Sequence, residues 1–346
     1  MSPPERSDFS ERAGLRAVAG RDRDPDRDQD LDLVVIGDCN PDVLVLGGDV
    51  TPAFGQQEQL VDQVSLEIGG SAAITAVAAA RLGLRVALVA AVGADPAGTF
   101  LLGQLAREDV DVSAVIIRDA APTGMTVALS RGTDRAILTA TGAMTSLTAD
   151  DIPVPLLARA RHVHVSSYFL LADSLGPGLA DVFSRARAAG AVTSLDTNWD
   201  PAGRWRDERL TGVIAAADLL LPNETEALAL SGTAELDAAV AALTALGPAV
   251  VVKLGERGVR CADSSATYQV SLPPMTPVDT TGAGDCFNAG LIAGLLQGLP
   301  LPEAAALGCA AGALSTSALG GTAGAPGLPT AAYLARHASV VVLPQR

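Results

Sequence analysis

Residues 278–293, VDTTGAGDCFNAGLIA, contain the pattern on which the interpretation of the whole chain rests. Three small residues, Gly282-Ala283-Gly284, precede an apolar run that predicts a helix. The first N–H groups of a helix have no partner within it, and the helix dipole is positive there, so this end suits a phosphate. Asp285 follows directly. A carboxylate at a helix start is usually a cap, but beside a phosphate it can also act as general base for a hydroxyl nucleophile.

The chain around this segment alternates between buried strands and helices. Short apolar runs such as 33–37 and 85–92 flank helical segments such as 72–82, and the same alternation returns after residue 150. This pattern predicts an α/β fold in which a mostly parallel sheet is covered by helices on both faces.

Two segments, about 42–68 and 113–141, break this alternation. They contain short β-rich runs with turn residues between them, so we expect them to form a small β lid on the main domain. The domain with its lid then spans 31–345. Residues 1–30 hold six Arg and eight acidic residues without an apolar run, which predicts a disordered charged tail.

The composition excludes several classes of function. The 346 residues carry a net charge of −15, which disfavours partners such as nucleic acids or an anionic membrane surface. Lys253 is the single lysine, and the leucine after it excludes a phosphate loop of the Gly-Lys-Ser/Thr type. The three His and four Cys show no metal-binding spacing. Few, dispersed cysteines and no secretory signal predict a cytoplasmic protein.

Five segments, taken in order, resemble the ribokinase-like (PfkB-type) carbohydrate kinases. They are GDCNPD at 37–42, GGSAAITAVAAARLG at 69–83, PNETE at 222–226, VVKLGERGV at 251–259 and DTTGAGDCFNAG at 279–290. The second and the last resemble the two signatures of that family. The resemblance covers all but the tail and implies a ribokinase-like three-layer αβα fold. It also implies a kinase that uses ATP and Mg²⁺ to phosphorylate a hydroxyl of a small sugar-like molecule.

The resemblance implies a role for each residue of the quoted loop. Asp285 would take the proton from the attacking hydroxyl, and three backbone N–H groups would stabilise the phosphoryl group in transfer, those of Gly282, Ala283 and Gly284.

On the acceptor side, the resemblance implies that Asn40 and Asp42 bind sugar hydroxyls. Gly69 and Gly70 would contact the sugar through their backbone and act as the hinge of the lid, which excludes water. From the residues alone, Asn-Pro-Asp is equally typical of a turn.

The resemblance also implies a nucleotide site. Its predicted residues are Asn223, Lys253, Gly255, Gly282 and Gly284. Asn223 and Glu226, three residues apart, would hold Mg²⁺ through water, although the same pair is also typical of a helix capping box. Lys253 could equally be a solvated residue at a strand end. Asp279 and Thr281 match positions that bind a monovalent cation such as K⁺ in many relatives.

Two departures from the pattern bear on the substrate. Ser71 and Ile74 stand where ribokinase has a Lys and an Asn that meet the sugar. Because Ile74 cannot pair with a hydroxyl, we expect an acceptor other than ribose, with an apolar edge. Residues 196–205, DTNWDPAGRW, resemble an Asp-x-Asn-x-Arg pattern of relatives acting on keto-deoxy sugar acids, with Asp200 at the Arg position.

The sequence therefore favours a sugar kinase and leaves two alternatives open. A nucleoside kinase of the same fold is one, and a non-catalytic sensor of sugars or nucleotides is the other. An exposed edge of the lid sheet predicts a homodimer.

Overall fold

The central sheet has ten strands, in a computed structural model that describes residues 30–131 and 134–344. The strands are β1 (Leu31–Ile36), β4 (Val86–Val89), β6 (Val110–Asp111), β10 (Ala160–Val165), β11 (Val192–Leu195), β12 (Leu219–Leu220), β13 (Ala249–Lys253), β14 (Val259–Ala262), β15 (Thr267–Ser271) and β16 (Ser339–Leu343). Their order is β16-β15-β14-β13-β12-β11-β10-β1-β4-β6. From β13 to β6 all neighbours are parallel, and the last three strands of the chain extend one edge antiparallel. The predicted mostly parallel sheet is confirmed.

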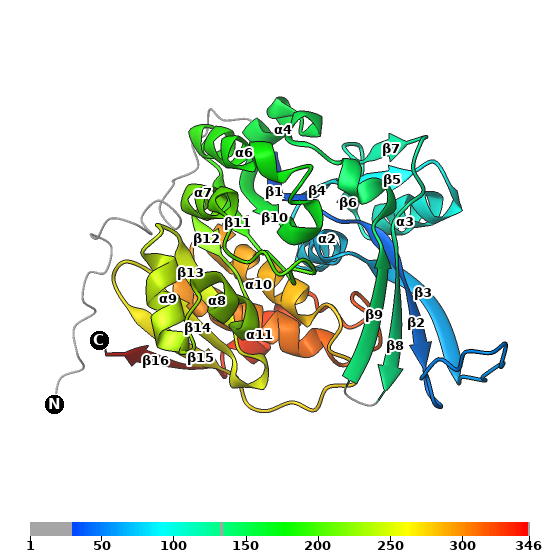
Figure 1. The fold of residues 1–346 in the computed structure, drawn as a ribbon. Coiled ribbons are helices and arrows are strands. Elements are labelled where there is room, and N and C mark those ends of the chain that lie inside the picture. The colour runs from blue at the N-terminus through cyan, green and yellow to red at the C-terminus, as the bar shows by residue number, and fades with distance from the viewer. Residues whose placement is uncertain (1–29, 132–133, 345–346) are drawn as a thin grey trace.

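Helices cover both faces of this sheet (Figure 1). On one face lie α4 (Val154–Arg159), α6 (Gly176–Ala188), α7 (Glu208–Ala216), α8 (Glu224–Ser231) and α9 (Leu236–Thr244). On the other lie α2 (Ser71–Arg81), α3 (Pro96–Arg107), α10 (Ala283–Leu296), α11 (Leu301–Ser315) and α12 (Leu328–Ala335). The three-layer αβα architecture is therefore confirmed.

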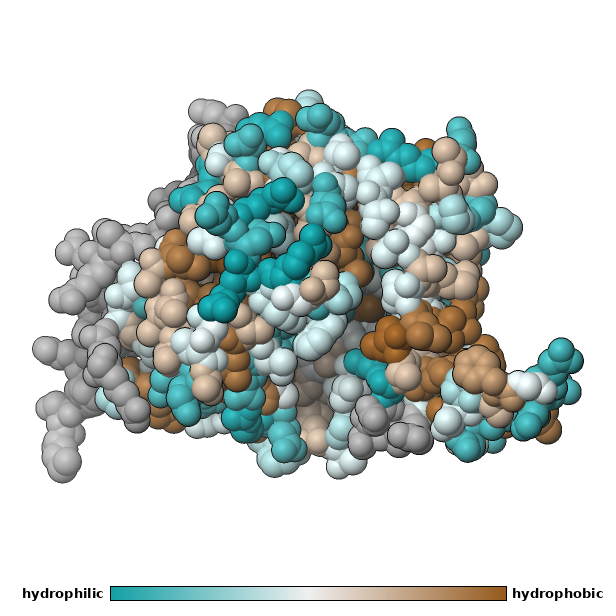
Figure 2. All heavy atoms as spheres, in the orientation of Figure 1, coloured by the Kyte–Doolittle hydropathy of each residue, from teal (hydrophilic) through white to brown (hydrophobic). Residues whose placement is uncertain are grey.

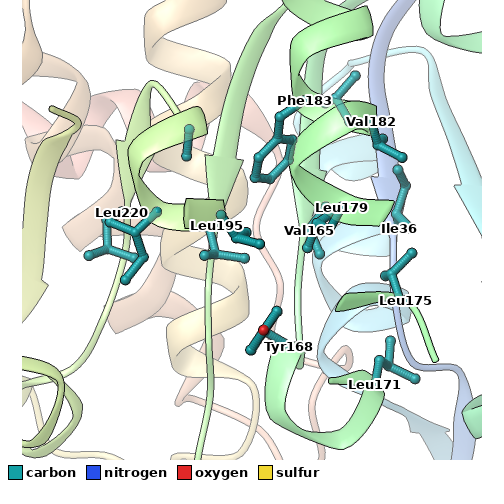
Figure 3. Close-up of a cluster of buried hydrophobic side chains, with 14 of the residues drawn as sticks. Ile36, Val165, Tyr168, Leu171, Leu175, Leu179, Val182, Phe183, Leu195 and Leu220 are labelled. Carbon is teal, nitrogen blue, oxygen red and sulfur yellow. The ribbon is translucent and has the colours of Figure 1, made fainter. Parts of the chain in front are cut away.

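The core on the first face explains why the sequences of the strands are continuous apolar runs. Ile36, Val165 and Leu195 point from three neighbouring strands toward α6, where they meet Leu179 and Phe183 (Figure 3). Since the opposite sides of the same strands are buried by the other helix layer, both faces of each strand must be apolar.

A second, four-stranded sheet projects from the main layers (Figure 1). It consists of β2 (Asn40–Leu46), β3 (Gln63–Gly69), β8 (Met125–Arg131) and β9 (Asp134–Ala140), in the order β3-β2-β8-β9. It is formed by the two segments that we expected to make the lid.

The structure differs from the expected lid at the start of the second segment. The first β-rich run there, β7 (Ile116–Arg118), pairs with β5 (Ala91–Gly93) in a separate two-stranded sheet. The strand expected at 85–92 breaks after Val89, and β5 then has a free edge that β7 fills. The projecting sheet therefore draws on its second segment only from Met125 onward. The predicted tail, up to residue 29, lies outside the described residues.

Two helices of the second face lie side by side and bring distant motifs together. α2 and α10 pack on each other through small residues, with Ala72, Ala76, Cys286 and Ala289 in one buried cluster. Residues 69–83 and 279–290 therefore meet in space. Across the described chain, no single helix has the length and hydropathy to cross a bilayer, and the bent pair α8–α9 passes only by length and composition.

Candidate active site

Asp285 lies in the first turn of α10, at the helix end that the sequence predicts to bind phosphate. Gly282 precedes the helix with φ 72°, and a Cβ there would lie 2.7 Å from the Gly321 carbonyl oxygen, so glycine is required. Burial, together with the negative charge of Asp196, raises the pKa of Asp285 well above its usual value. Such a shift is typical of carboxylates that act as acids or bases.

The N-terminus of α2 reaches the same carboxylate. Asp38 accepts hydrogen bonds from the backbone N–H groups of Ser71 (3.1 Å) and Ala72 (3.0 Å), which fixes the start of the helix. The Ser71 side chain favours the ionised form of Asp285, and its hydroxyl accepts a hydrogen bond of 2.7 Å from Asn198. The position of Asp285 is thus set by two helix starts and a strand end.

Asn40 and Asp42 lie together at the root of the projecting sheet. The Asn40 amide donates to Asp42 Oδ1 and to Thr126 Oγ1, both at 3.0 Å, and its side chain is almost wholly buried. Burial and the charge of Asp38 raise the pKa of Asp42 to about 7. A buried pair of polar groups of this kind suits recognition of hydroxyls.

The two glycines make room for these side chains. A Cβ on Gly69 would lie 1.9 Å from Asp42 Oδ1, and a Cβ on Gly70, whose φ is 86°, would lie 3.1 Å from Asn40 Oδ1. The structure therefore brings all four predicted acceptor residues to one place.

A cavity of about 350 Å³ opens beside the first turn of α10. Gly255 and Gly284, which the resemblance assigns to the nucleotide site, line it together with the α11 residues Gly312 and Ala313. Ala283 also lines it, and the Ala283 N–H donates to the Thr280 carbonyl, 3.3 Å away. The remaining lining residues are Lys253, Glu256, Gly258, Val259, Leu272, Pro273, Pro274, Met275, Pro277, Thr280, Phe287, Cys309 and Thr316.

Asn223 and Glu226 form a helix capping box, which was one of the two roles that the sequence allowed for this pair. Asn223 Oδ1 accepts from the Glu226 N–H, and the Glu226 carboxylate accepts from the Asn223 N–H, each at 2.9 Å. Burial and the charge of Asp196 raise the pKa of Glu226 to about 7. The carboxylate is therefore short of positive charge, so an added cation would favour its ionised form.

Asp279 lies in the loop before α10 with both oxygens in use. Oδ1 accepts from the N–H (2.9 Å) and the hydroxyl (2.8 Å) of Thr281, and Oδ2 accepts from the Gly320 N–H (2.8 Å). Arg135, on β9, hydrogen-bonds to Thr281 and lies 3.7 Å from Asp279 Oδ1. Because a guanidinium already supplies the positive charge here, these residues do not fit a potassium site in this conformation.

One side chain lies elsewhere than predicted. Ile74 packs against the loop before α10 and the loop after α11, since a Cβ on Gly282 or Gly321 would meet its side-chain carbons at 3.0 and 2.4 Å. Its role in the structure is to support these two loops, so the apolar-edge argument loses its basis.

Several polar residues at the site were not predicted as site residues. Asp38 and Asn288 lie inside two of the quoted motifs, close to residues that were predicted as site residues. Their position in these motifs is the sequence signal that could have identified them. Thr126 and Arg135 carry no sequence signal, because only the pairing of β8 and β9 with β2 brings them here.

Comparisons with known proteins identify the family of the chain. Residues 30–328 match the pfkB family carbohydrate kinase. Ribokinase from Haemophilus influenzae is 29% identical over 306 residues, 85% of this chain and 95% of that protein. Fructokinase from Klebsiella pneumoniae is 34% identical over 277 residues, 75% and 88% of the two chains. The solved structure of Arabidopsis thaliana ribokinase with ribose and ATP has a TM-score of 0.75 at 24% identity, covering 88% of this chain and 99% of that one. The chain therefore belongs to the pfkB family of carbohydrate kinases.

Proposed function

We propose that this protein is an ATP-dependent kinase that transfers the γ-phosphoryl group to a hydroxyl of a small sugar-like substrate. The position of Asp285 carries the proposal. Its neighbour Gly284 lines the nucleotide-sized cavity. Ser71, whose side chain favours the ionised form of Asp285, follows Gly70, which borders the acceptor residues. Phosphate donor, base and hydroxyl acceptor would then stand in the order that in-line transfer needs.

The chemistry follows from these positions. Asp285 accepts the proton of the acceptor hydroxyl while the hydroxyl oxygen bonds to the γ-phosphorus. The bond from the γ-phosphorus to the β–γ bridging oxygen breaks, and ADP is released. The free N–H groups at the start of α10, at Gly282 and Gly284, stabilise the negative charge on the phosphoryl oxygens. The projecting sheet covers the acceptor and keeps water, a competing acceptor, out of the site.

The residues present fit magnesium better than potassium. Asn223 and Glu226 would hold Mg²⁺ through water, and the bound ion supplies positive charge to the phosphate oxygens. At Asp279, Arg135 holds the place of a cation, so no step depends on potassium.

We further propose that a second copy of the chain covers the outer face of the projecting sheet. Cross-strand partners Val43 and Leu66, Val43 and Val127, and Val127 and Leu138 place apolar side chains of all four strands on one face. Leu66 and Leu138 are 45% and 64% exposed. Figure 2 shows hydrophobic residues gathered over these strands. The opposite face carries Asp42 and turns to the acceptor, so a partner on the apolar face leaves the site accessible.

The cysteines bear on the compartment. All four are buried and unpaired, as expected of a protein kept in the reducing cytoplasm where ATP is made and used.

The first experiment measures ADP release with Mg-ATP across pentoses, hexoses, sugar acids and nucleosides, for the wild type and Asp285→Asn. We expect one sugar to be phosphorylated and the variant to lose a factor of roughly 10²–10⁴ in turnover, with ADP affinity by calorimetry within about threefold. Asp263→Asn, in the turn between β14 and β15, is the matched control and should keep full turnover.

The outcomes of this experiment distinguish a sugar kinase from a nucleoside kinase and from a non-catalytic sensor. A variant that retains more than about a third of the turnover would remove Asp285 as the base. Turnover of nucleosides alone would assign a nucleoside kinase, and ADP binding without turnover of any acceptor would favour a sensor.

A further inference from the structure

The side chain of the single lysine lies beside the base and is 15% exposed. Lys253 ends β13, and its Nζ lies 2.5 Å from Asp196 Oδ2 and 3.4 Å from Asn288 Oδ1. The same Asp196 oxygen accepts a hydrogen bond of 2.6 Å from the Asn288 amide. Asn288 stands three residues after Asp285 on α10, so one helix face carries both side chains. Lys253, Asp196 and Asn288 therefore form one hydrogen-bonded group next to Asp285.

The charges of this group do not balance without the lysine. Asp196, Glu226 and Asp285 are all buried, and each of them interacts with the ammonium group of Lys253. Asp38 adds a fourth carboxylate on the side of α2. Packed carboxylates in a weakly polar interior disfavour each other's ionised forms, so the one cation decides how many can be charged.

The nearest histidines supply no second cation. His164 Nδ1 and His162 Nε2 each lie 2.7 Å from the Ser194 hydroxyl, and the rings are fully buried. Burial lowers the pKa of His164 to about 4 and that of His162 to about 3, so both are neutral at physiological pH.

We infer that Lys253 and Asp196 form a buried ion pair that acts through Asp285: Lys253 is a positioning residue that cancels the charge of Asp196 beside the base, and its ammonium group is not a ligand of the nucleotide. The inference rests on the proposed function only in naming Asp285 as the base.

The bonds of Lys253 argue against a nucleotide role. Its side chain borders the cavity, but its Nζ is bound to Asp196, whose carboxylate is 1% exposed and has Lys253 as its ion-pair partner. Turning the ammonium group toward a phosphate would leave that carboxylate buried and uncompensated, which is strongly unfavourable.

The test uses three variants, Lys253→Met, Asp196→Asn and the double variant, and the pH profile of kcat/KM, whose acid limb reports the base in the free enzyme. Removing the cation disfavours ionised Asp285, so Lys253→Met should move the limb up by about one pH unit or more. Removing the neighbouring anion should move it down in Asp196→Asn. In the double variant the two changes cancel, and the limb should return to within about half a unit of the wild type.

The nucleotide constant provides the second readout. We expect KM for ATP to stay within about threefold in all three variants, and the double variant to recover at least about tenfold of the turnover that Lys253→Met loses at pH 7. Arg118→Met, which breaks a part-buried ion pair of 2.7 Å with Asp151 outside the site, controls for general destabilisation and should leave the limb in place.

Each outcome decides the matter. A rise of more than tenfold in KM for ATP in Lys253→Met, unrelieved in the double variant, would make the lysine a nucleotide ligand. The inference would also be overturned if the acid limbs of Lys253→Met and Asp196→Asn did not move in opposite directions. If Lys253→Met does not fold, Asp196→Asn alone must still move the limb down. If the wild type phosphorylates nothing, the proposed function fails, and ¹³C NMR titration of the Asp285 carboxyl in the same proteins still tests the ion pair.

Discussion

Asp42 holds a carboxylate where its negative charge is costly. Its pKa rises from 3.8 to about 7 through burial and the charge of Asp38. A group with a raised pKa contributes stability below its unfolded value and loses it as pH rises through the folded value. We therefore expect Asp42→Asn to increase the free energy of unfolding by roughly 2–4 kcal/mol at pH 8 and by much less at pH 5, while sugar affinity falls.

Thermal unfolding of both proteins at the two pH values measures the first effect, and calorimetry with the sugar measures the second. Asp62→Asn, at an exposed position just before β3, should change neither. An equal stability difference at pH 5 and pH 8 would mean that the charge of Asp42 is not its origin.

Single residues could be predicted from the sequence where a role depends on near neighbours in the chain. Gly282, Asp285 and the Asn223–Glu226 pair belong to short patterns with a local physical meaning. The pair Lys253–Asp196 could not be predicted in this way. Its members are 57 positions apart, at the ends of β13 and β11, and the alternation of strands and helices does not specify which strand ends meet.

At the scale of elements, the turn from β3 into α2 sets the acceptor site. A methyl group on Gly69 would collide with the Asp42 carboxylate, so we expect Gly69→Ala to raise KM for the sugar by at least about tenfold and to lower Tm, at a cost of ~1–3 kcal/mol. Gly103→Ala is the matched control, because nothing lies within 4 Å of a Cβ there and alanine favours helix α3.

Kinetics and thermal unfolding of the two variants provide the comparison. Gly103→Ala should keep the KM and gain ~0.5–1 kcal/mol of stability. A Gly69→Ala enzyme with an unchanged KM for the sugar would show that the contact with Asp42 does not shape the acceptor site.

Elements were predictable where the apolar period persists, and less so where strands are short. The helical segment predicted at 72–82 agrees with α2 to within one residue at each end. The partner of β7 was missed, because three residues carry too little pattern to distinguish a lid strand from an edge beside β5.

At the scale of the whole molecule, the projecting sheet presents an apolar outer face on which Leu66 and Leu138 are 45% and 64% exposed. We expect light scattering to give the molar mass of a dimer for the wild type. Leu66→Asp should give the molar mass of a monomer, because it places a charge in the interface. Val154→Asp changes an apolar residue on α4 that is 53% exposed, against 45% for Leu66, and should leave the dimer intact. A monomeric wild type at micromolar concentration would exclude this interface.

The ion pair of Lys253 also determines how its amine can be modified. Lys253 is the single lysine, and its side chain is 15% exposed and bound to Asp196. Acetylation, ubiquitin attachment and ester-activated dyes all need a free, deprotonated amine. We therefore expect the Lys253 side chain to resist all three reagents until its ion pair with Asp196 opens.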